Sequence, residues 1–227
     1  MPTKVKRRRV DGLNPEPSQG HPISHPNEVT FTPKQIWESI RELEGKHPDI
    51  NQELIEYYAQ VARHEGLSGR GVDVAAGLNI FPSRGLVKGG LDGMFLTDRI
   101  YNTKDPYPLE PRIHLLHGES TRLPFRDHSM DLVLFHRSLE FIRGYAGGLK
   151  PPKINYSVEG LSDRVLESSV AEAVRILKPG GGIVLAEMPA DWEGDAAATQ
   201  LLKSGFKDLH SPIKRLSDKT ALVLGRR

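Results

Sequence analysis

The sequence predicts an α/β protein whose core is a doubly wound, mostly parallel sheet of seven strands. From residue 70 onward, short apolar runs alternate with turns and helical stretches, which is typical of α/β units. The clearest helix, at about 162–177, ends at a Lys-Pro-Gly-Gly turn, because proline lacks the N–H that a helix needs and glycine permits positive φ. The expected strands are Val72–Ala75, Met94–Thr97, Ile113–Leu116, Asp131–Phe135, Ile183–Ala186, Phe206–His210 and Ala221–Leu224, the last of them antiparallel.

The composition is that of an ordinary globular domain. Of 227 residues, 37% are hydrophobic and 26% are charged, which is enough to bury one sizeable core. No run approaches the roughly 18 apolar residues of a membrane helix, so we expect a soluble, intracellular protein, with its compartment left open. Disulfides and thiolate nucleophiles are excluded because there is no cysteine. Without an H-E-x-x-H spacing, we expect no metal site.

Three regions are expected along the chain: a flexible tail at 1–30, a helical flank at 31–67 and the main domain at 68–227. The tail is rich in proline and glycine and has no helical or strand period. Residues 4–9 carry five Lys and Arg side chains, and without them the net charge of +2 becomes −3. This basic run is a solvated terminus, a nuclear localisation signal or a contact to RNA or a ribonucleoprotein, and these alternatives stay open.

Two helices are expected in the flank. Thr32 is a good N-cap, Pro33 suits the first helical position and Gln35 can complete a capping box. Gly45 is a natural stop for this first helix. Apolar residues at helical spacing predict a second helix at about 51–65.

Three segments follow one another in the main domain. The most specific, G-E-S-T-R-L-P-F-R-D-H-S-M-D-L-V at 118–133, is followed by L-E-F-I at 139–142 and by a helix with an R-I-L-K-P-G-G turn at 170–181. In content, order and spacing they resemble the class I S-adenosylmethionine-dependent methyltransferases, a family that includes ubiquinone and menaquinone biosynthetic enzymes. The resemblance covers about 68–227, and it implies a Rossmann-like fold and S-adenosylmethionine as the cofactor.

Residues that follow the second and third strands are candidates for cofactor binding. Asp98 ends the second strand, 21 residues after Gly77, close to the offset of about 20 at which an acid reaches ribose hydroxyls in dinucleotide folds. The family's acid after the third strand accepts a hydrogen bond from the adenine amino group, and Glu119 matches it. The resemblance further implies that the Ser120 backbone N–H serves a ring nitrogen and that Leu123 packs beside the ring.

The glycine loop after the first strand is the weakest match. The family's D/E-x-G-x-G-x-G lies on Asp73 to Asn79, where only the middle glycine is kept, as Gly77. Ala75 replaces the first glycine and narrows the space for backbone approach, whereas Asn79, in place of the last, tolerates left-handed φ. The helix that normally follows is expected to be interrupted by Pro82, Gly85, Gly89 and Gly90.

The resemblance implies transfer of a methyl group to an acceptor that the sequence does not identify. A hydroxyl or protonated amine acceptor needs a base, for which His136, just past the fourth strand, is the candidate. The alternative is that His136 is a hydrogen-bonded histidine lining the cofactor pocket. Loops at 143–160 and around Asp191 and Trp192 are long enough to cap that pocket.

Two other functions compete with methyl transfer. A dinucleotide-dependent oxidoreductase is disfavoured, because A-x-G-x-N replaces the G-x-G-x-x-G that such enzymes need at the first turn. The stronger rival is a catalytically impaired methyltransferase-like binding or assembly subunit that docks on RNA or a ribonucleoprotein through residues 4–9.

Overall fold

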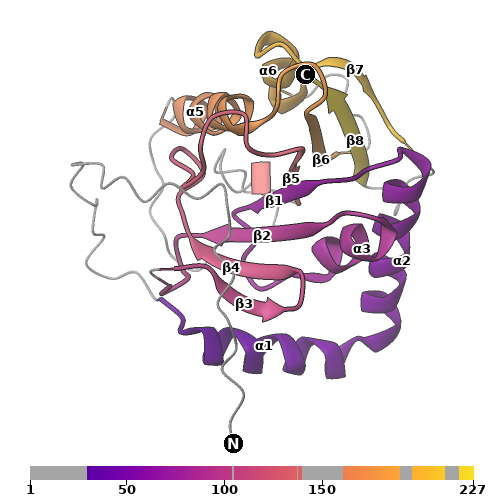
Figure 1. The fold of residues 1–227 in the computed structure, drawn as a ribbon, viewed down its shortest axis with the longest axis vertical. Coiled ribbons are helices and arrows are strands. Elements are labelled where there is room, and N and C mark those ends of the chain that lie inside the picture. The colour runs from indigo at the N-terminus through magenta and orange to yellow at the C-terminus, as the bar shows by residue number, and fades with distance from the viewer. Residues whose placement is uncertain (1–29, 104, 137, 140–160, 190–195, 213–219) are drawn as a thin grey trace, which may run out of the picture.

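The computed structural model describes residues 30–103, 105–136, 138–139, 161–189, 196–212 and 220–227. One eight-stranded sheet lies at its centre, in the order β3-β4-β2-β1-β5-β6-β8-β7 (Figure 1). Within the described residues, no helix has the length and apolar character to cross a membrane. The strands are β1 (Arg70–Val74), β2 (Gly93–Asp98), β3 (Tyr107–Glu110), β4 (Ile113–His117), β5 (Leu132–Phe135), β6 (Ile183–Pro189), β7 (Lys207–His210) and β8 (Thr220–Arg226).

The doubly wound, mostly parallel sheet that the sequence predicts is confirmed. β1, β2, β4, β5 and β6 pair in parallel, and β8, the last strand, is antiparallel as expected and lies between β6 and β7. The eighth strand, β3, was not expected: it pairs antiparallel with β4 at the edge of the sheet. Its Tyr-Pro-Leu-Glu sequence has no apolar alternation, and its first two residues are exposed. Proline is tolerated there because an edge strand need not donate on both sides.

The parallel register brings the carboxyl ends of the central strands to one edge of the sheet. Asp98 at the end of β2 lies opposite His117 at the end of β4, and Phe135 at the end of β5 lies opposite Ala186 in β6. Segments that follow β1, β2, β4 and β5 therefore begin at the same edge, which is where open α/β sheets bind ligands.

The sheet separates two apolar cores. Along β5, Leu132 and Leu134 face the core shared with the first three helices, while Val133 and Phe135 face the core beneath α5. All four side chains are buried, as expected for a central parallel strand covered on both faces. The helices are α1 (Pro33–Lys46), α2 (Pro48–His64), α3 (Phe81–Gly89), α5 (Leu161–Ile176) and α6 (Ala196–Lys203).

The predicted start of α1 is confirmed in detail. Gln35 donates its backbone N–H to the Thr32 hydroxyl at 3.4 Å, and Thr32 donates its backbone N–H to the Gln35 side chain at 2.9 Å. These two bonds form the capping box, which satisfies backbone donors that a helix start leaves unpaired. The second expected helix is also present, but α2 begins earlier, at Pro48. Proline there pre-sets the helical φ and lacks an N–H that would otherwise need a partner.

The expectation that the helix after the glycine loop is interrupted was wrong. α3 is continuous from Phe81 to Gly89, and Gly90 follows it as the C-cap with φ +138°. Pro82 lies in the first turn, where its missing N–H breaks no helical bond. Gly85 and Gly89 serve the packing of α3 on α2: a Cβ on Gly85 would stand 2.5 Å from the carbonyl oxygen of Ile55. These glycines allow two helix backbones to approach closely.

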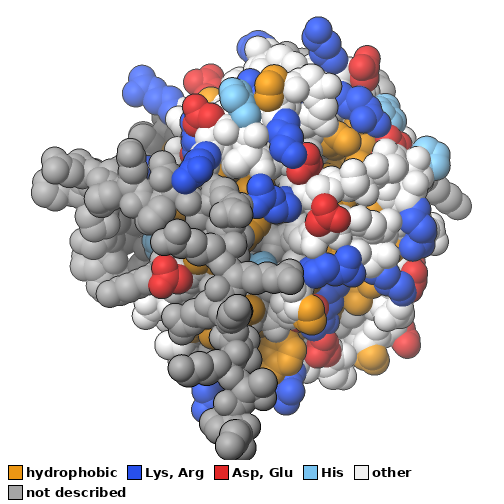
Figure 2. All heavy atoms as spheres, viewed as in Figure 1, with side chains coloured by type: hydrophobic (Ala, Val, Ile, Leu, Met, Phe, Trp, Pro, Cys, Tyr) orange, Lys and Arg blue, Asp and Glu red, His pale blue; other side chains and the backbone are white. Residues whose placement is uncertain are grey.

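Charged side chains of both signs are interspersed over the described part of the face in Figure 2. That part of the face therefore carries no single-sign field of the kind that favours nucleic-acid binding.

Candidate functional site at the carboxyl edge of the sheet

The loop after β1 has a left-handed backbone at two of the three positions where the family's motif has glycine. Ala75 has φ +55° and Gly77 has φ +57°, so both adopt the left-handed conformation. A Cβ added to Gly77 would meet no described heavy atom within 4 Å, so this backbone faces open space. The loop therefore offers the exposed backbone that a bound ligand needs, although one of its left-handed residues is an alanine.

We expect Ala75→Gly to raise the free energy of unfolding by about 0.5–1 kcal/mol. Left-handed φ costs an L-residue roughly 1–2 kcal/mol, and the added flexibility of glycine in the unfolded chain offsets part of this gain. Urea unfolding measures the change. The neighbouring Ala76→Gly is the control: Ala76 is buried and has no positive φ, so this variant is expected to lose about 1 kcal/mol. Destabilisation by both variants would contradict strain at Ala75.

Asp98 ties the end of β2 to the glycine loop. Its carboxylate accepts the backbone N–H of Gly77 at 2.9 Å and that of Ile100 at 3.1 Å. The Tyr101 hydroxyl donates to the carbonyl oxygen of Gly77, so this residue is held from both sides. Burial raises the pKa of Asp98, and the backbone hydrogen bonds from Ile100 and Gly77 oppose that rise.

Asp73 lies beneath the loop and is completely buried. Its carboxylate accepts the Ser83 hydroxyl at 3.0 Å, and among the described residues its second oxygen has no hydrogen-bond partner. Burial raises the pKa of Asp73 well above the ordinary value, and the negative charge of Asp98 adds to the rise. At this position the side chain therefore anchors the loop to α3 from below.

The stability of the protein is expected to fall as pH rises through the raised pKa of Asp73. The folded state binds the proton more tightly than the unfolded state, so the stabilising contribution is complete below the ordinary aspartate pKa of about 3.9 and is lost above the raised value. Asp73→Asn keeps the acceptor for Ser83 but does not titrate, so its urea midpoint should depend less on pH in this window. If the urea midpoints of the wild type and of Asp73→Asn changed equally with pH, this would contradict a raised pKa for Asp73.

His136, directly after β5, sits in a buried polar cluster. Its Nδ1 lies 2.8 Å from Glu187 of β6 and 3.2 Å from the Tyr58 hydroxyl of α2. Its Nε2 lies 2.8 Å from the side-chain nitrogen of Asn79, whose amide oxygen accepts the N–H of Phe81. Because the amide nitrogen of Asn79 can only donate, Nε2 is the acceptor and the imidazole proton lies on Nδ1. The cluster thus joins the glycine loop to β5 and β6.

The loop after β4 holds the residues expected at the adenine. Glu119 is exposed, and its carbonyl accepts the N–H of Arg122 at 2.9 Å in a short turn. The Ser120 hydroxyl is hydrogen bonded to that of Ser169 in α5 at 2.8 Å. Leu123 is buried in the core beneath α5, so its side chain packs inward at this position.

The structure thus brings together Gly77 with Asp98, and Asn79 with His136, by direct hydrogen bonds. Glu119 follows β4 at the same edge, where its carbonyl oxygen accepts the N–H of Arg122. Sequence reasoning missed Glu187 and Tyr58, because nothing in their own segments marks them and only the fold brings them to His136. In the described parts of the chain, no group of three or more His, Asp or Glu side chains is placed to hold a metal ion.

Several segments that the sequence singled out lie wholly or mostly outside the described residues. These are most of the L-E-F-I segment, of which only Leu139 is described, and the two loops expected to cap the pocket. The basic run at 4–9 lies outside them as well.

Comparison with known proteins supports the fold. Residues 98–185 match the family model of the methyltransferase domain. A comparison with the curated proteins found no match. Among solved structures, the fold is similar to a putative S-adenosylmethionine-dependent methyltransferase of Methanococcus maripaludis, with TM-score 0.53, 11% identity and coverage of 84% of this chain and 93% of that one. It is also similar to a TehB-like methyltransferase of Corynebacterium glutamicum, with TM-score 0.53, 13% identity and coverage of 86% and 97%.

Proposed function

We propose that this chain, which carries a class I S-adenosylmethionine-dependent methyltransferase domain, binds its cofactor at the carboxyl edge of the sheet and transfers the methyl group to an acceptor. The observation that carries the proposed site is the hydrogen bond from the Gly77 backbone to Asp98. It joins the open loop after β1 to the acid at the end of β2, the two groups that would hold the methionine and ribose parts of the cofactor.

The residues at this edge fit the chemistry of S-adenosylmethionine. The Asp98 carboxylate would accept the ribose hydroxyls, since its two oxygens can accept further hydrogen bonds beside those from the backbone N–H groups of Gly77 and Ile100. Gly77 leaves open space above its backbone for the ligand. Glu119 would accept the adenine amino group, and the backbone N–H of Ser120 would serve the ring.

Catalysis would come chiefly from alignment. The cofactor supplies a methyl group that its sulfonium already makes electrophilic, so the protein has to hold the acceptor atom in line with it. Positioning of this kind can supply about 7–11 kcal/mol of the barrier in favourable systems. The polar cluster around His136 lies beside the glycine loop and is the place where the acceptor would approach.

The contacts of His136 support a positioning role ahead of a role as base. To act as a base, Nε2 would have to give up its hydrogen bond to Asn79 and contact the methyl acceptor instead. The nearby carboxylate of Glu187 would then stabilise the ring that carries a proton on both nitrogens. In its present contacts, His136 holds Asn79 where the family has its third glycine. The catalytic role predicted for His136 stays a prediction.

The degenerate glycine loop is the feature that favours the rival function, an assembly subunit without turnover. The left-handed backbone at Ala75 and Gly77 weakens that support, because the loop keeps its open shape with alanine in place of glycine. The methyltransferase is therefore the function that the geometry favours. A contact of residues 4–9 with RNA or a ribonucleoprotein would be compatible with either function.

Calorimetric titration of the full chain with S-adenosylmethionine tests the proposal before any acceptor is known. We expect one equivalent to bind with a dissociation constant well below 1 mM. Failure to bind at millimolar cofactor would overturn the proposal in favour of the assembly subunit.

A further inference from the structure

We propose that Glu172 and Arg175 of α5 are positioning residues that hold the loop after β4 in the shape that receives the adenosine half of the cofactor. The inference rests on the proposed function, because it takes that loop as the adenine site. It assigns a role in cofactor affinity to two side chains that need not touch the cofactor.

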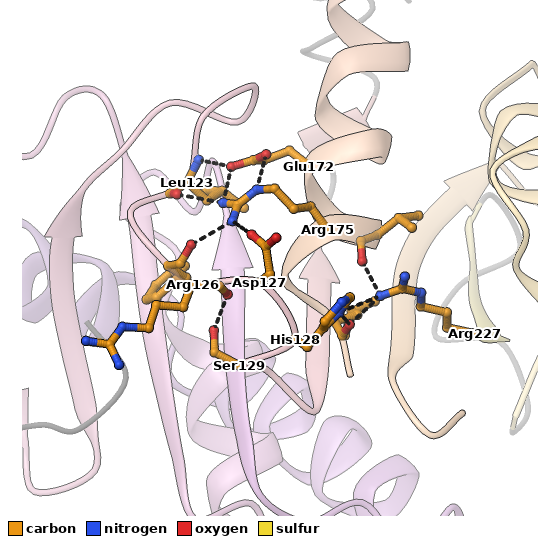
Figure 3. A network of polar contacts seen from close by, with 11 residues as sticks. Leu123, Arg126, Asp127, His128, Ser129, Glu172, Arg175 and Arg227 are labelled. Carbon is orange, nitrogen blue, oxygen red and sulfur yellow. Dashed lines mark hydrogen bonds and ion pairs between the residues drawn. The ribbon is translucent and has the colours of Figure 1, made fainter. Parts of the chain in front are cut away.

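Arg175 binds the backbone of the loop directly. Its Nη1 donates to the carbonyl oxygen of Phe125 at 2.9 Å, and its Nη2 donates to that of Leu123 at 3.1 Å (Figure 3). A third contact, from Nη1 to Asp127 at 2.6 Å, involves a carboxylate whose side chain is mostly exposed. Only a planar guanidinium can serve two backbone carbonyls in this fixed geometry, because a lysine presents a single point charge.

Glu172 completes the clamp and orients the arginine. Its Oε1 accepts the backbone N–H of Leu123 at 2.7 Å, and its two oxygens accept Nη2 of Arg175 at 2.6 Å and Nε at 2.7 Å. The N–H and the C=O of Leu123 are therefore both held by one ion pair. Charge-assisted bidentate pairs of this kind are among the strong hydrogen bonds of proteins.

A third polar residue of α5 reaches the same loop from the same side of the helix. Ser169, Glu172 and Arg175 are spaced three residues apart, which places them along one face. Ser169 is completely buried and is hydrogen bonded to Ser120, one residue after the proposed adenine acid Glu119. The helix thus tethers the loop by polar contacts at positions 120, 123 and 125, although apolar contacts would be enough to pack a helix on a sheet.

The loop depends on these tethers because its own backbone offers few alternatives. Between Glu119 and Phe125, the backbone hydrogen bonds within the described residues are the turn from Arg122 to Glu119 and the contact from Phe125 to Leu123. Without the clamp, the loop would sample more conformations, and ligand binding would have to offset the entropy of ordering it.

The test compares Arg175→Lys with Asp127→Asn in the full chain. Calorimetry gives the dissociation constants for S-adenosylhomocysteine and for 5′-methylthioadenosine, which has the adenine and ribose but lacks the amino-acid part. Since a net hydrogen bond is worth about 2- to 12-fold in affinity, Arg175→Lys should raise both constants by about tenfold and by the same factor. Asp127→Asn removes the charge from only the exposed contact of Arg175 and should change the two dissociation constants by less than about twofold.

The other possible results of these titrations contradict either the inference or the proposed function. A lower melting temperature with unchanged dissociation constants would reduce the clamp to fold stability and overturn the inference. If Arg175→Lys weakened the binding of S-adenosylhomocysteine but not that of 5′-methylthioadenosine, the inference would also be overturned, because the substitution would then act on the amino-acid half of the cofactor. If Arg175→Lys does not fold, Ser169→Ala, expected to weaken both ligands by about threefold, decides in the same way. No binding by the wild type would overturn the proposed function, and this inference with it.

Discussion

Gly85→Ala is expected to lower the free energy of unfolding by about 1–3 kcal/mol, the usual range for forcing a methyl group into a packed core. The added Cβ would lie 2.5 Å from the Ile55 carbonyl oxygen and 2.7 Å from the Tyr58 Cβ, both on α2. Neither atom can move away without shifting α2, because one is backbone and the other is fixed to it. The measurement is urea unfolding followed by circular dichroism.

Gly45→Ala is the matched control for this variant. Gly45 lies in the last turn of α1, and a Cβ there would meet no described atom within 4 Å. Alanine should therefore stabilise this helix by up to about 0.5–1 kcal/mol. Opposite signs for the two glycine-to-alanine changes are the expected result. Equal effects would contradict the close approach of α2 and α3.

Asp98→Ala is expected to weaken S-adenosylmethionine binding by about 10- to 100-fold, which corresponds to roughly 1.5–3 kcal/mol for a hydrogen bond to a charged group. The variant removes the acceptor proposed for the ribose and also releases the Gly77 N–H. Asp92→Ala is the control, because Asp92 is an exposed acid that precedes β2 at the opposite end of the strand. Equal affinities of the wild type and of Asp98→Ala for S-adenosylmethionine would contradict the proposed site.

Cofactor affinity should also depend on pH through Asp98. Burial raises its pKa, and the ionised form is the better acceptor for two ribose hydroxyls. Affinity is therefore expected to fall as pH decreases through this raised pKa, at a higher pH than for an exposed aspartate. Calorimetric titrations of the wild type and of Asp98→Ala at decreasing pH measure this change in affinity. The affinity of Asp98→Ala should no longer depend on pH in this range.

How far the sequence predicts this fold differs from element to element for physical reasons. Buried parallel strands and the capping box at Thr32 are local patterns, so they could be predicted. β3 could not, since its pairing with β4 is set by the sheet and its own residues are half exposed. For Gly85 and Gly89, helix propensity pointed to an interruption, but the close packing of α3 on α2 outweighs it.

The candidate site was predictable where a residue lies at the end of a strand or within a few residues of it. Gly77, Asp98 and His136 are such residues, because parallel strands deliver them to one edge. Glu187 is an acid within an apolar strand, and its partner His136 comes from another strand, so only the tertiary structure assigns it a contact. Arg175 belongs to a motif that the sequence did mark, but its bonds to Leu123 and Phe125 span about 50 residues and depend on the folded loop.

A crystal structure of the chain with S-adenosylhomocysteine bound would show whether the cofactor lies at the carboxyl edge of the sheet. We expect the ribose hydroxyls within hydrogen-bond distance of the Asp98 carboxylate, the amino-acid part over Gly77 and the adenine against the loop at Glu119 and Ser120. Ligand bound elsewhere on the sheet, or with its ribose away from Asp98, would contradict this expectation.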